Sequence, residues 1–413
     1  MSGNVPNGWR EVRIGQIARE VSKRNRGSAD IPVLSMTKHR GFVRSNEYFS
    51  KSVYSENTEQ YKIVKRGQFA YATIHLDEGS IDYLKNEDAG LISPMYTVFE
   101  TNCEEIDTEI AFWKFKRFAL SGRFDPYSNG GVNRRKSILF SDLSAFKFAL
   151  PPLAEQRAIV EVLGSAEQAI AKAEALIAAL LATKGEVLED RLRISTQRGW
   201  EISRLRDVAT IRTGISKSKE RKFKDPLSVP YLRVANVQDG YLDLKEIKLI
   251  TIEKDQLARY SLKKGDVLFN EGGDFDKLGR GCVWSGQITP CVHQNHVFAV
   301  RCKPTLNPEF LALLAASRRG KAYFRLSSKQ TTNLASINTS DLRSFPVLLP
   351  PMNEQMEIAT IASSFDARVT AEKASLVRLV EMRAALVQEL LSGRVRLPES
   401  IIERHRDKAG QAA

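Results

Sequence analysis

The feature that most constrains the fold of this chain is an internal repeat, in which the second half of the sequence resembles the first. Six short segments recur in the same order, and the distance between copies drifts only from 191 to 199 residues. A period this long indicates two copies of one domain, since solenoid and propeller repeats are about 20–50 residues long. The matching segments are Gly8-Trp9 and Gly199-Trp200, Arg13-Ile14 and Arg204-Leu205, Ile31 to Leu34 and Val229 to Leu232, Lys65 to Gly67 and Lys263 to Gly265, Ser141 to Leu143 and Ser340 to Leu342, and Leu150 to Gln156 and Leu349 to Gln355.

Each copy predicts a globule followed by a long helix. The globules contain short β-forming runs, such as Gln68 to Ile74 and Val297 to Val300, between glycine, asparagine and aspartate residues. A double proline precedes each helix, and proline suits the first turn of a helix. We therefore expect an α+β protein with two mixed α/β globules separated by two long helices. The expected segments are a globule at 1–150, a central helix at 151–193, a second globule at 194–349, a C-terminal helix at 350–397 and a flexible tail at 398–413.

Both helices carry apolar residues at alternating steps of four and three, the heptad pattern of a coiled coil. A helix of about 40 residues is ~60 Å long at 1.5 Å per residue. Because neither apolar seam is stable in water, we expect the helices to pair as an antiparallel coiled coil with an internal pseudo-twofold axis. The seam contains Ile159, Leu163, Ile170, Ile177 and Leu180 in the first helix and Ile358, Phe365, Leu376 and Leu379 in the second.

Polar seam positions bear on the register of this pair. An antiparallel arrangement could bring Lys184 beside Glu372, and the alternative is that both side chains extend into solvent. Ala173 occupies the slot of the first helix that corresponds to Glu372. The two helices are therefore not interchangeable, and exact symmetry is not expected.

The basic charge lies on the globules. The net charge of +13 divides into +4 on residues 1–150, −2 on 151–193, +11 on 194–349 and zero on 350–413. A basic excess indicates an anionic partner, nucleic acid first. No run approaches the ~20 apolar residues of a membrane span, and the first 13 residues lack an apolar signal region. The four cysteines form no CxxC pair, so we expect a reduced, cytoplasmic setting without a disulfide framework.

Basic side chains gather in segments that also hold glycine or amide residues. Arginine and lysine bind phosphates and guanine, whereas asparagine and glutamine can bind adenine with two hydrogen bonds. We expect these segments to contact DNA, and the alternative is that they are solvated surface turns. The candidates are Lys38, His39 and Arg40, then Asn129, Asn133, Arg134, Arg135 and Lys136, then Lys217, Lys219 and Lys222, and finally Lys329, Gln330, Thr331 and Asn333.

The sequence lacks strong catalytic motifs. There is no GxxxxGK[ST] loop for an ATPase. Asp125-Pro126-Tyr127 lacks the second proline of an adenine methyltransferase motif, and Glu246-Ile247-Lys248 fits only the end of a nuclease Glu-x-Lys motif. We therefore expect no catalytic residue on this chain.

A metal site is also not expected. In a strand, Cys291 and His293 would face one side and His296 the other, so these side chains would not converge. The favoured interpretation is core cysteines with surface or base-reading histidines. The alternative is a metal cluster of Cys282, Cys291, His293, His296 and Cys302.

The two Leu-Pro-Pro-Leu/Met-x-Glu-Gln segments carry a resemblance to a known family. Each opens a long heptad helix behind a basic globule, and the second helix ends in Leu390 to Leu397. In these features the chain resembles the specificity subunit of type I restriction-modification systems, over roughly residues 8 to 397. The resemblance implies that each globule is a target recognition domain reading one half of a bipartite, asymmetric DNA site. The paired helices would set the gap between the halves.

The resemblance also implies partners and cofactors. Two methylation subunits would dock on this chain, bring S-adenosylmethionine and flip an adenine for N6 methylation. Two restriction subunits would add translocation and cleavage with ATP and Mg²⁺, and this chain would hold no cofactor itself. The docking residues would be the helix-opening Glu155, Gln156, Glu354 and Gln355 together with the apolar seam.

Three other functions stay open. The specificity chain of a fused methyltransferase-nuclease system would look the same at this level. A coiled-coil scaffold with basic modules would bind RNA or protein, and its binding would not depend on DNA sequence. A nuclease centred on Glu246 and Lys248 would cleave DNA with magnesium.

Overall fold

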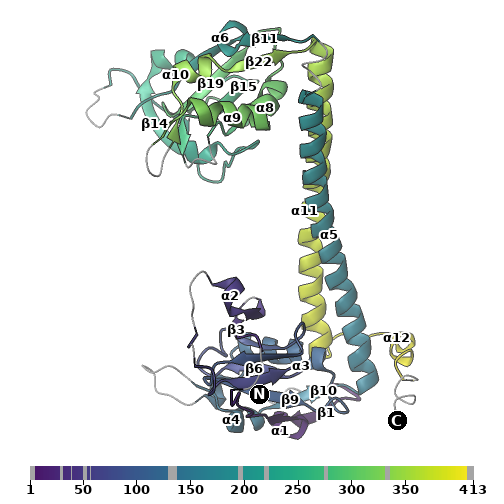
Figure 1. Cartoon of the computed structure of the whole chain (residues 1–413). Coiled ribbons are helices and arrows are strands. Elements are labelled where there is room, and N and C mark those ends of the chain that lie inside the picture. The colour runs from purple at the N-terminus through teal and green to yellow at the C-terminus, as the bar shows by residue number, and fades with distance from the viewer. Residues whose placement is uncertain are drawn as a thin grey trace. The chain divides into compact units, whose positions relative to one another are not determined.

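The computed structural model describes residues 5–27, 31–38, 40–49, 54–55, 57–128, 137–193, 199–217, 223–273, 278–330 and 335–406. The chain forms two compact units (Figure 1). Unit 1 contains Met1–Ala173 and Ser375–Ala413, and unit 2 contains Glu174–Ala374. Each unit therefore holds one globule and a part of both long helices.

A four-stranded antiparallel sheet forms the centre of unit 1. Its strand order is β2-β9-β6-β7, and helix α3 packs against it. Phe69 of the sheet stacks on Phe99 and meets Phe115 of the helix edge-on, so an aromatic cluster fills this core. The bounds are β2 (Ala18–Glu20), β6 (Phe69–Ala72), β7 (Ile81–Tyr83), β9 (Tyr96–Thr101) and α3 (Thr108–Leu120).

Smaller strand pairs complete the globule of unit 1. Strand β1 pairs with β10 directly before the long helix, β3 pairs with β4, and β5 pairs with β8. The bounds are β1 (Arg10–Arg13), β3 (Leu34–Thr37), β4 (Gly41–Arg44), β5 (Lys62–Lys65), β8 (Ala89–Ile92), β10 (Lys147–Leu150), α1 (Ile14–Ile17), α2 (Ser45–Tyr48), α4 (Phe140–Ser144) and the 3-10 helix η1 (Asp125–Tyr127).

Unit 2 has a sheet with the corresponding strand order, β12-β19-β15-β17, also antiparallel. Helix α8 packs on β15 and β17, and β11 pairs with β22 as β1 does with β10. The bounds are β11 (Glu201–Arg204), β12 (Ala209–Thr213), β15 (Asp266–Asn270), β17 (Gly281–Val283), β19 (Val297–Cys302), β22 (Pro346–Leu349) and α8 (Pro308–Ala316).

Two further small sheets belong to unit 2. One is β14-β13-β18, and the other is a ribbon in the order β16-β21-β20. The bounds are β13 (Pro226–Leu232), β14 (Lys248–Glu253), β16 (Gly272–Gly273), β18 (Val292–His293), β20 (Lys329–Gln330), β21 (Ala335–Ser336), α6 (Leu205–Val208), α7 (Leu257–Tyr260), α9 (Arg318–Ser327), α10 (Thr339–Arg343), η3 (Val234–Asn236) and η4 (Lys254–Gln256).

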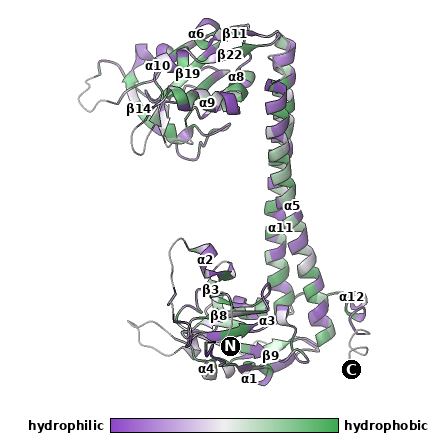
Figure 2. Cartoon of the chain, in the orientation of Figure 1, coloured by the Kyte–Doolittle hydropathy of each residue, from purple (hydrophilic) through white to green (hydrophobic). Residues whose placement is uncertain are grey.

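The long helices begin directly after the double prolines. Helices α5 (Leu153–Arg193) and α11 (Met352–Ser392) have 41 residues each. Figure 2 shows hydrophilic and hydrophobic residues alternating along both. Among the described residues, no helix has the length and apolar character that crossing a membrane requires. Of the predicted seam, Ile159, Leu163, Ile170 and Ile358 are buried, and Ile177, Leu180, Phe365, Leu376 and Leu379 are half-buried.

Within each unit, the two helix segments lie side by side. In unit 2 they run in opposite directions, because residues further along α5 contact residues that come earlier on α11. The ion pairs are Lys184 with Asp366 at 2.5 Å and Arg191 with Glu357 at 3.4 Å in unit 2, and Glu167 with Arg383 at 2.7 Å in unit 1.

The predicted pairing of Lys184 with Glu372 is wrong. The Lys184 ammonium contacts the Asp366 carboxylate instead. Glu372 pairs with Arg368, one turn earlier on its own helix, at 2.7 Å. The actual partner is therefore six residues away from the predicted one on α11.

The prediction of a flexible tail from residue 398 is wrong for the part that the structure describes. Helix α12 (Glu399–Glu403) follows Pro398 directly, and its Ile402 is buried. His405 Nε2 lies 2.7 Å from the carboxylate of Glu161 on α5. The buried Ile402, this hydrogen bond and the ion pair of Arg404 with Glu161 at 3.3 Å thus hold this segment on unit 1.

Candidate nucleic-acid interface

The hairpin of β3 and β4 presents the first predicted basic cluster. Its turn holds Lys38 and Arg40, which are both exposed. The Lys38 ammonium lies 3.8 Å from the Glu78 carboxylate, and the Arg40 guanidinium carbon lies 5.7 Å from the centre of the Tyr48 ring. Surface contacts of this kind contribute little free energy, so both cations can exchange them for a phosphate. His39 lies outside the described residues.

The β16-β21-β20 ribbon carries the last predicted cluster. Lys329 and Gln330 form β20, which pairs with β21, and β21 pairs with β16 on its other edge. The Lys329 side chain is exposed. A short β-ribbon that presents an exposed cation can approach a DNA groove. Thr331 and Asn333 lie outside the described residues.

The remaining predicted contacts are described only in part. Lys217 is exposed, and its ammonium nitrogen lies 5.9 Å from the centre of the buried Tyr231 ring. A cation over an aromatic face is positioned without losing its charge. Lys217 thus lies beside β13, whereas Lys329 lies on the ribbon. Outside the described residues lie Asn129, Asn133, Arg134, Arg135, Lys136, Lys219 and Lys222.

A polar group beside the ribbon contains His296, one of the histidines expected at the surface or in contact with bases, and it is exposed. Glu271, which precedes β16, forms a short hydrogen bond with His296 Nδ1 through its carboxylate. Asn295 Nδ2 lies 3.2 Å from His296 Nε2. His296 has 54% of its side chain exposed. Because Nδ1 donates to the carboxylate, Nε2 of the neutral imidazole is an acceptor, which suits an amino group on a base edge.

The corresponding place in unit 1 is apolar. Ile138 N donates to Thr73 O at 3.0 Å, just as Ile337 N donates to Glu271 O at 2.8 Å in unit 2. There the exposed side chain is Met95, with 64% of its surface accessible. The same backbone frame thus presents a thioether in one unit and an imidazole in the other. Only the Asn295-His296 pair next to a strand could have indicated this position from sequence.

Cys282 and Cys291 are buried, Cys302 is half-buried and Cys103 is exposed. Burial raises the pKa of the Cys282, Cys291 and Cys302 thiols to about 12. The expectation of a surface or base-reading histidine is wrong for His293, which is 1% exposed. Burial lowers its pKa to about 4, and its Nδ1 lies 2.6 Å from Val297 O. Within the described ranges, no three histidine, cysteine, aspartate or glutamate side chains gather as a metal site would need.

The described residues around Glu246 do not support the nuclease alternative. The Glu246 side chain is 71% exposed, and its carboxylate lies 3.5 Å from Lys248 and 3.6 Å from Arg233. Two cations around one surface carboxylate form an ordinary ion-pair network. A nuclease would need further carboxylates to hold magnesium there.

Gln156 and Gln355, predicted as docking residues, anchor the long helices to the globules. Both side chains are buried, at 0% and 1% exposure. Gln156 accepts from Asp107 N at 2.8 Å and donates to Glu105 O at 3.1 Å and Pro151 O at 2.9 Å. Gln355 makes the corresponding three bonds, to Asn307 N at 2.8 Å, Thr305 O at 3.0 Å and Pro350 O at 2.9 Å. Both side chains therefore form their hydrogen bonds within their own unit and are not exposed to a docking partner.

Glu155 is likewise held inside unit 1. Its carboxylate accepts from Trp9 Nε1 at 3.1 Å and forms a two-pronged ion pair with Arg396 at 2.6 and 2.7 Å. Its side chain is 4% exposed. This contact fastens the segment after α11 to the beginning of the chain. Glu354 of α11 is half-buried.

Comparison with known proteins identifies one family. Residues 197–380 match the family model of the type I restriction modification DNA specificity domain. The chain is 28% identical over 185 residues to the putative type I restriction enzyme MjaX specificity subunit of Methanocaldococcus jannaschii, covering 44% of this chain and 41% of that protein. It is 25% identical over 227 residues to the type I restriction enzyme EcoKI specificity subunit of Escherichia coli K12, covering 51% and 48%.

A solved structure shares the fold. The HsdS subunit from Thermoanaerobacter tengcongensis superposes with a TM-score of 0.54 at 17% identity, covering 95% of this chain and 99% of that one. The chain spans about half the length of the curated relatives described above. The matches confirm the resemblance to type I specificity subunits and the mixed α/β architecture with long helices.

Proposed function

Residues 197–380 match the family model of the type I restriction modification DNA specificity domain, and from this match we propose that the chain is the DNA-reading subunit of a type I restriction-modification complex. The family match is the observation that carries the proposal. In this role the chain selects the DNA site and contributes no catalytic residue.

Each globule reads one half of a bipartite, asymmetric site. The support is that the two globules have corresponding sheets but different exposed groups. Residues 1–150 carry a net charge of +4 and residues 194–349 carry +11, so both attract the phosphate backbone. The exposed side chains then differ, with Met95 in unit 1 where unit 2 has His296. Different side chains on corresponding frames suit two different half-sites.

The long helices form an antiparallel coiled coil that sets the gap between the half-sites. The support is the seam of buried and half-buried apolar residues and the antiparallel ion pairs within unit 2. At 1.5 Å per residue, a helix of 41 residues is ~60 Å long. Half-sites one DNA turn apart are ~34–36 Å apart, which a spacer of this length can span.

The outer faces of the helices receive the methylation subunits. The support is that both helices expose large apolar side chains, which a partner surface would cover. Two methylation subunits would bring S-adenosylmethionine and methylate adenine N6, and two restriction subunits would add ATP- and Mg²⁺-dependent cleavage. The exposed apolar residues of the helices are Leu176, Leu181, Met356, Val377, Val380 and Met382, between 39% and 56% accessible.

Methylation mapping tests this function directly. The chain would be co-expressed with its methylation subunit in a host free of adenine methylation, and N6-methyladenine would be located by long-read sequencing. We expect one split motif with a fixed gap, and no methylation when this chain is omitted.

Two outcomes would refute the proposal. Methylation at the same sites without this chain would remove its role in site selection. A stable complex that binds all DNA sequences equally would favour the scaffold function instead.

A further inference from the structure

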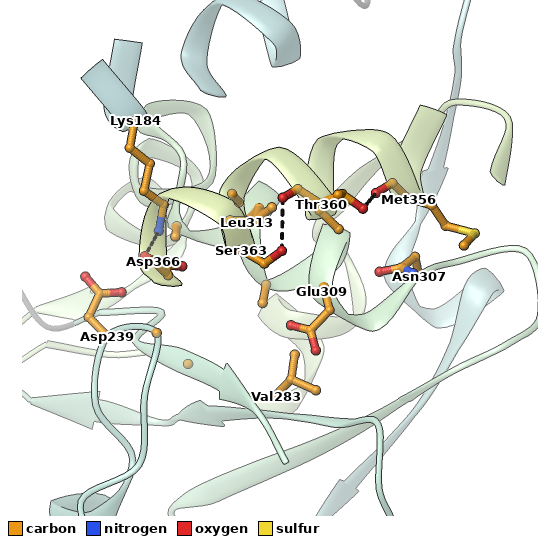
Figure 3. A pocket seen from close by; sticks show the side chains of 16 residues that line it. Lys184, Asp239, Val283, Asn307, Glu309, Leu313, Met356, Thr360, Ser363 and Asp366 are labelled. Atoms are coloured by element: carbon orange, nitrogen blue, oxygen red, sulfur yellow. Dashed lines mark hydrogen bonds and ion pairs between the residues drawn. The ribbon is translucent and has the colours of Figure 1, made fainter. Parts of the chain in front are cut away.

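An open groove lies in unit 2 between the globule and the start of α11. Its volume is about 520 Å³ (Figure 3). Ala312 and Leu313 of α8 form one wall, and Met356 and Thr360 of α11 form the other. The ion pair of Lys184 and Asp366 lies at one end. This volume falls within the range of ~300–1,000 Å³ that holds small ligands or anchoring side chains.

The corresponding place in unit 1 is filled by the chain itself. Gln156 accepts from the N-cap residue of α3, and Gln355 accepts from the N-cap residue of α8. The two N-caps therefore correspond, and α3 and α8 can be aligned residue by residue from them. By that alignment Phe112 and Trp113 stand where unit 2 has Ala312 and Leu313. The sheet registers likewise place Tyr83 where unit 2 has Val283.

The three rings of unit 1 form one packed group. The centres of the Phe112 and Trp113 rings are 5.4 Å apart, and those of Tyr83 and Phe112 are 5.9 Å apart. The Lys85 ammonium lies 4.4 Å from the Phe112 ring centre and 4.6 Å from that of Tyr83. Unit 2 has small or aliphatic residues at all three ring positions, which leaves the groove open.

One polar residue is the same in both units. Glu109 of α3 accepts a hydrogen bond from the Tyr83 hydroxyl. Its counterpart Glu309 lies in the groove with its carboxylate toward Val283, which has no hydroxyl to offer (Figure 3). The Glu309 carboxylate has no hydrogen bond or ion pair with any residue that the structure describes. Burial raises the pKa of this carboxyl group, since the groove keeps part of its surface from water.

The lining hydroxyls do not satisfy this carboxylate. Thr360 Oγ1 donates to Met356 O at 2.8 Å, and Ser363 Oγ donates to Thr360 O at 2.9 Å, so both turn back to their own helix. Met356, 55% exposed, extends the apolar wall at the groove. The groove thus combines an apolar slot with one exposed carboxylate, to which the described residues offer no hydrogen-bond donor.

We propose that this groove is a docking site for the methylation subunit, which inserts a tyrosine side chain whose hydroxyl donates to Glu309. The tyrosine takes the place that Tyr83 fills in unit 1, and its ring packs on Ala312 and Leu313. Aromatic anchors in pockets carry much of the binding energy of protein interfaces, and tyrosine joins an apolar body to a polar tip. The inference rests on the function proposed above.

The site makes the two docking events unequal. Unit 1 offers a closed aromatic surface, whereas unit 2 offers a slot with an acceptor. One of two methylation subunits is therefore held by an anchor that the other lacks.

Filling the groove tests the inference. The double variant Ala312→Phe/Leu313→Trp copies the residues of unit 1 into unit 2. Glu309→Met keeps the groove open but removes the acceptor, and Ala258→Phe adds a ring at an exposed position of α7 as the matched control. Binding of the purified full chain to the methylation subunit would be measured by titration calorimetry and native mass spectrometry.

The wild type should bind two subunits. The filled variant should weaken one binding event at least thirtyfold and leave the other unchanged. Glu309→Met should weaken the same event about tenfold, and Ala258→Phe should weaken neither.

Three results would overturn the inference. Wild-type affinity at both sites in the filled variant would show that nothing enters the groove. Equal weakening of both sites would remove the assignment to unit 2. A wild-type chain that binds no methylation subunit would refute the proposed function itself, and with it this inference.

Discussion

Replacing Gln156 by leucine should destabilise unit 1 specifically. The substitution removes three hydrogen bonds at a fully buried side chain. At a net of about 1 kcal/mol for each bond, the loss is about 3 kcal/mol, and it grows if the stranded backbone groups stay buried without water. For a unit of this size, about 3 kcal/mol lowers the melting temperature by about 6–12 °C. Gln355→Leu should have the same effect on unit 2.

Hydrogen exchange followed by mass spectrometry separates the two units. In Gln156→Leu, protection should fall in peptides of unit 1 and remain in those of unit 2, and Gln355→Leu should give the reverse. Gln388→Leu, at an exposed position of α11, is the matched control and should change neither. A loss below about 1 kcal/mol, or an equal loss in both units, would refute the view that each glutamine anchors its own globule.

Other changes test the buried charges, the reading surface and the spacer. Burial lowers the pKa of Lys114 to about 7, so the folded state binds fewer protons between there and the ordinary value of 10.5. Unit 1 should therefore gain stability as pH rises through this window, and Lys114→Met should abolish that slope in urea titrations. Arg396→Met leaves the buried Glu155 unpaired and should cost about 3 kcal/mol in thermal unfolding, most of which Glu155→Gln in the same chain should restore. His296→Ala should change one half of the methylated motif and leave the other half intact, as read by sequencing. Four residues inserted after Ala178 should lengthen the gap of that motif, and an unchanged gap would contradict the spacer.

The long helices could be predicted because their pattern is local. A heptad shows which side of a helix is apolar, and the seam positions are indeed the buried and half-buried ones. The pattern does not say which turn of one helix meets which turn of the other. Lys184 therefore has Asp366 as its partner, although Glu372 also lies on the seam. The register depends on where the globules anchor the helices, and the heptad pattern carries no information about those anchor points.

The anchors themselves illustrate the same limit. The Pro-Pro-x-x-Glu-Gln segments stand out in the sequence because they occur twice. Repetition marks a residue as required but does not tell a surface role from a buried one. Gln156 meets the cap of α3, which lies 49 residues earlier in the chain, and only the folded globule brings the two together.

The candidate DNA-contacting surface was predictable only as a set of basic segments. Exposed cations such as Lys38 and Lys329 follow from composition, because charged side chains seldom lie in a core. The pair of Glu271 and His296 could not be predicted, since the two residues meet across neighbouring strands. The groove beside Glu309 could not be predicted either, because it is defined by three rings that unit 2 lacks.

One more pair of positions indicates how the two globules could read different half-sites, as proposed above. In unit 1, Gln68 accepts from Lys65 N at 2.9 Å and donates to Glu100 on the neighbouring strand at 2.9 Å.

In unit 2, the same turn is closed by Asp266, which accepts from Lys263 N at 2.8 Å and pairs with Arg301 on the neighbouring strand at 2.7 and 2.8 Å. The hydrogen bond to the turn is the same, while the cross-strand partner changes from an acid to a base. The frame therefore depends on backbone geometry and tolerates a reversal of charge at the half-buried cross-strand position. An exposed position such as that of Met95 or His296 is under weaker constraint still, so its side chain can change the recognised base without cost to the fold.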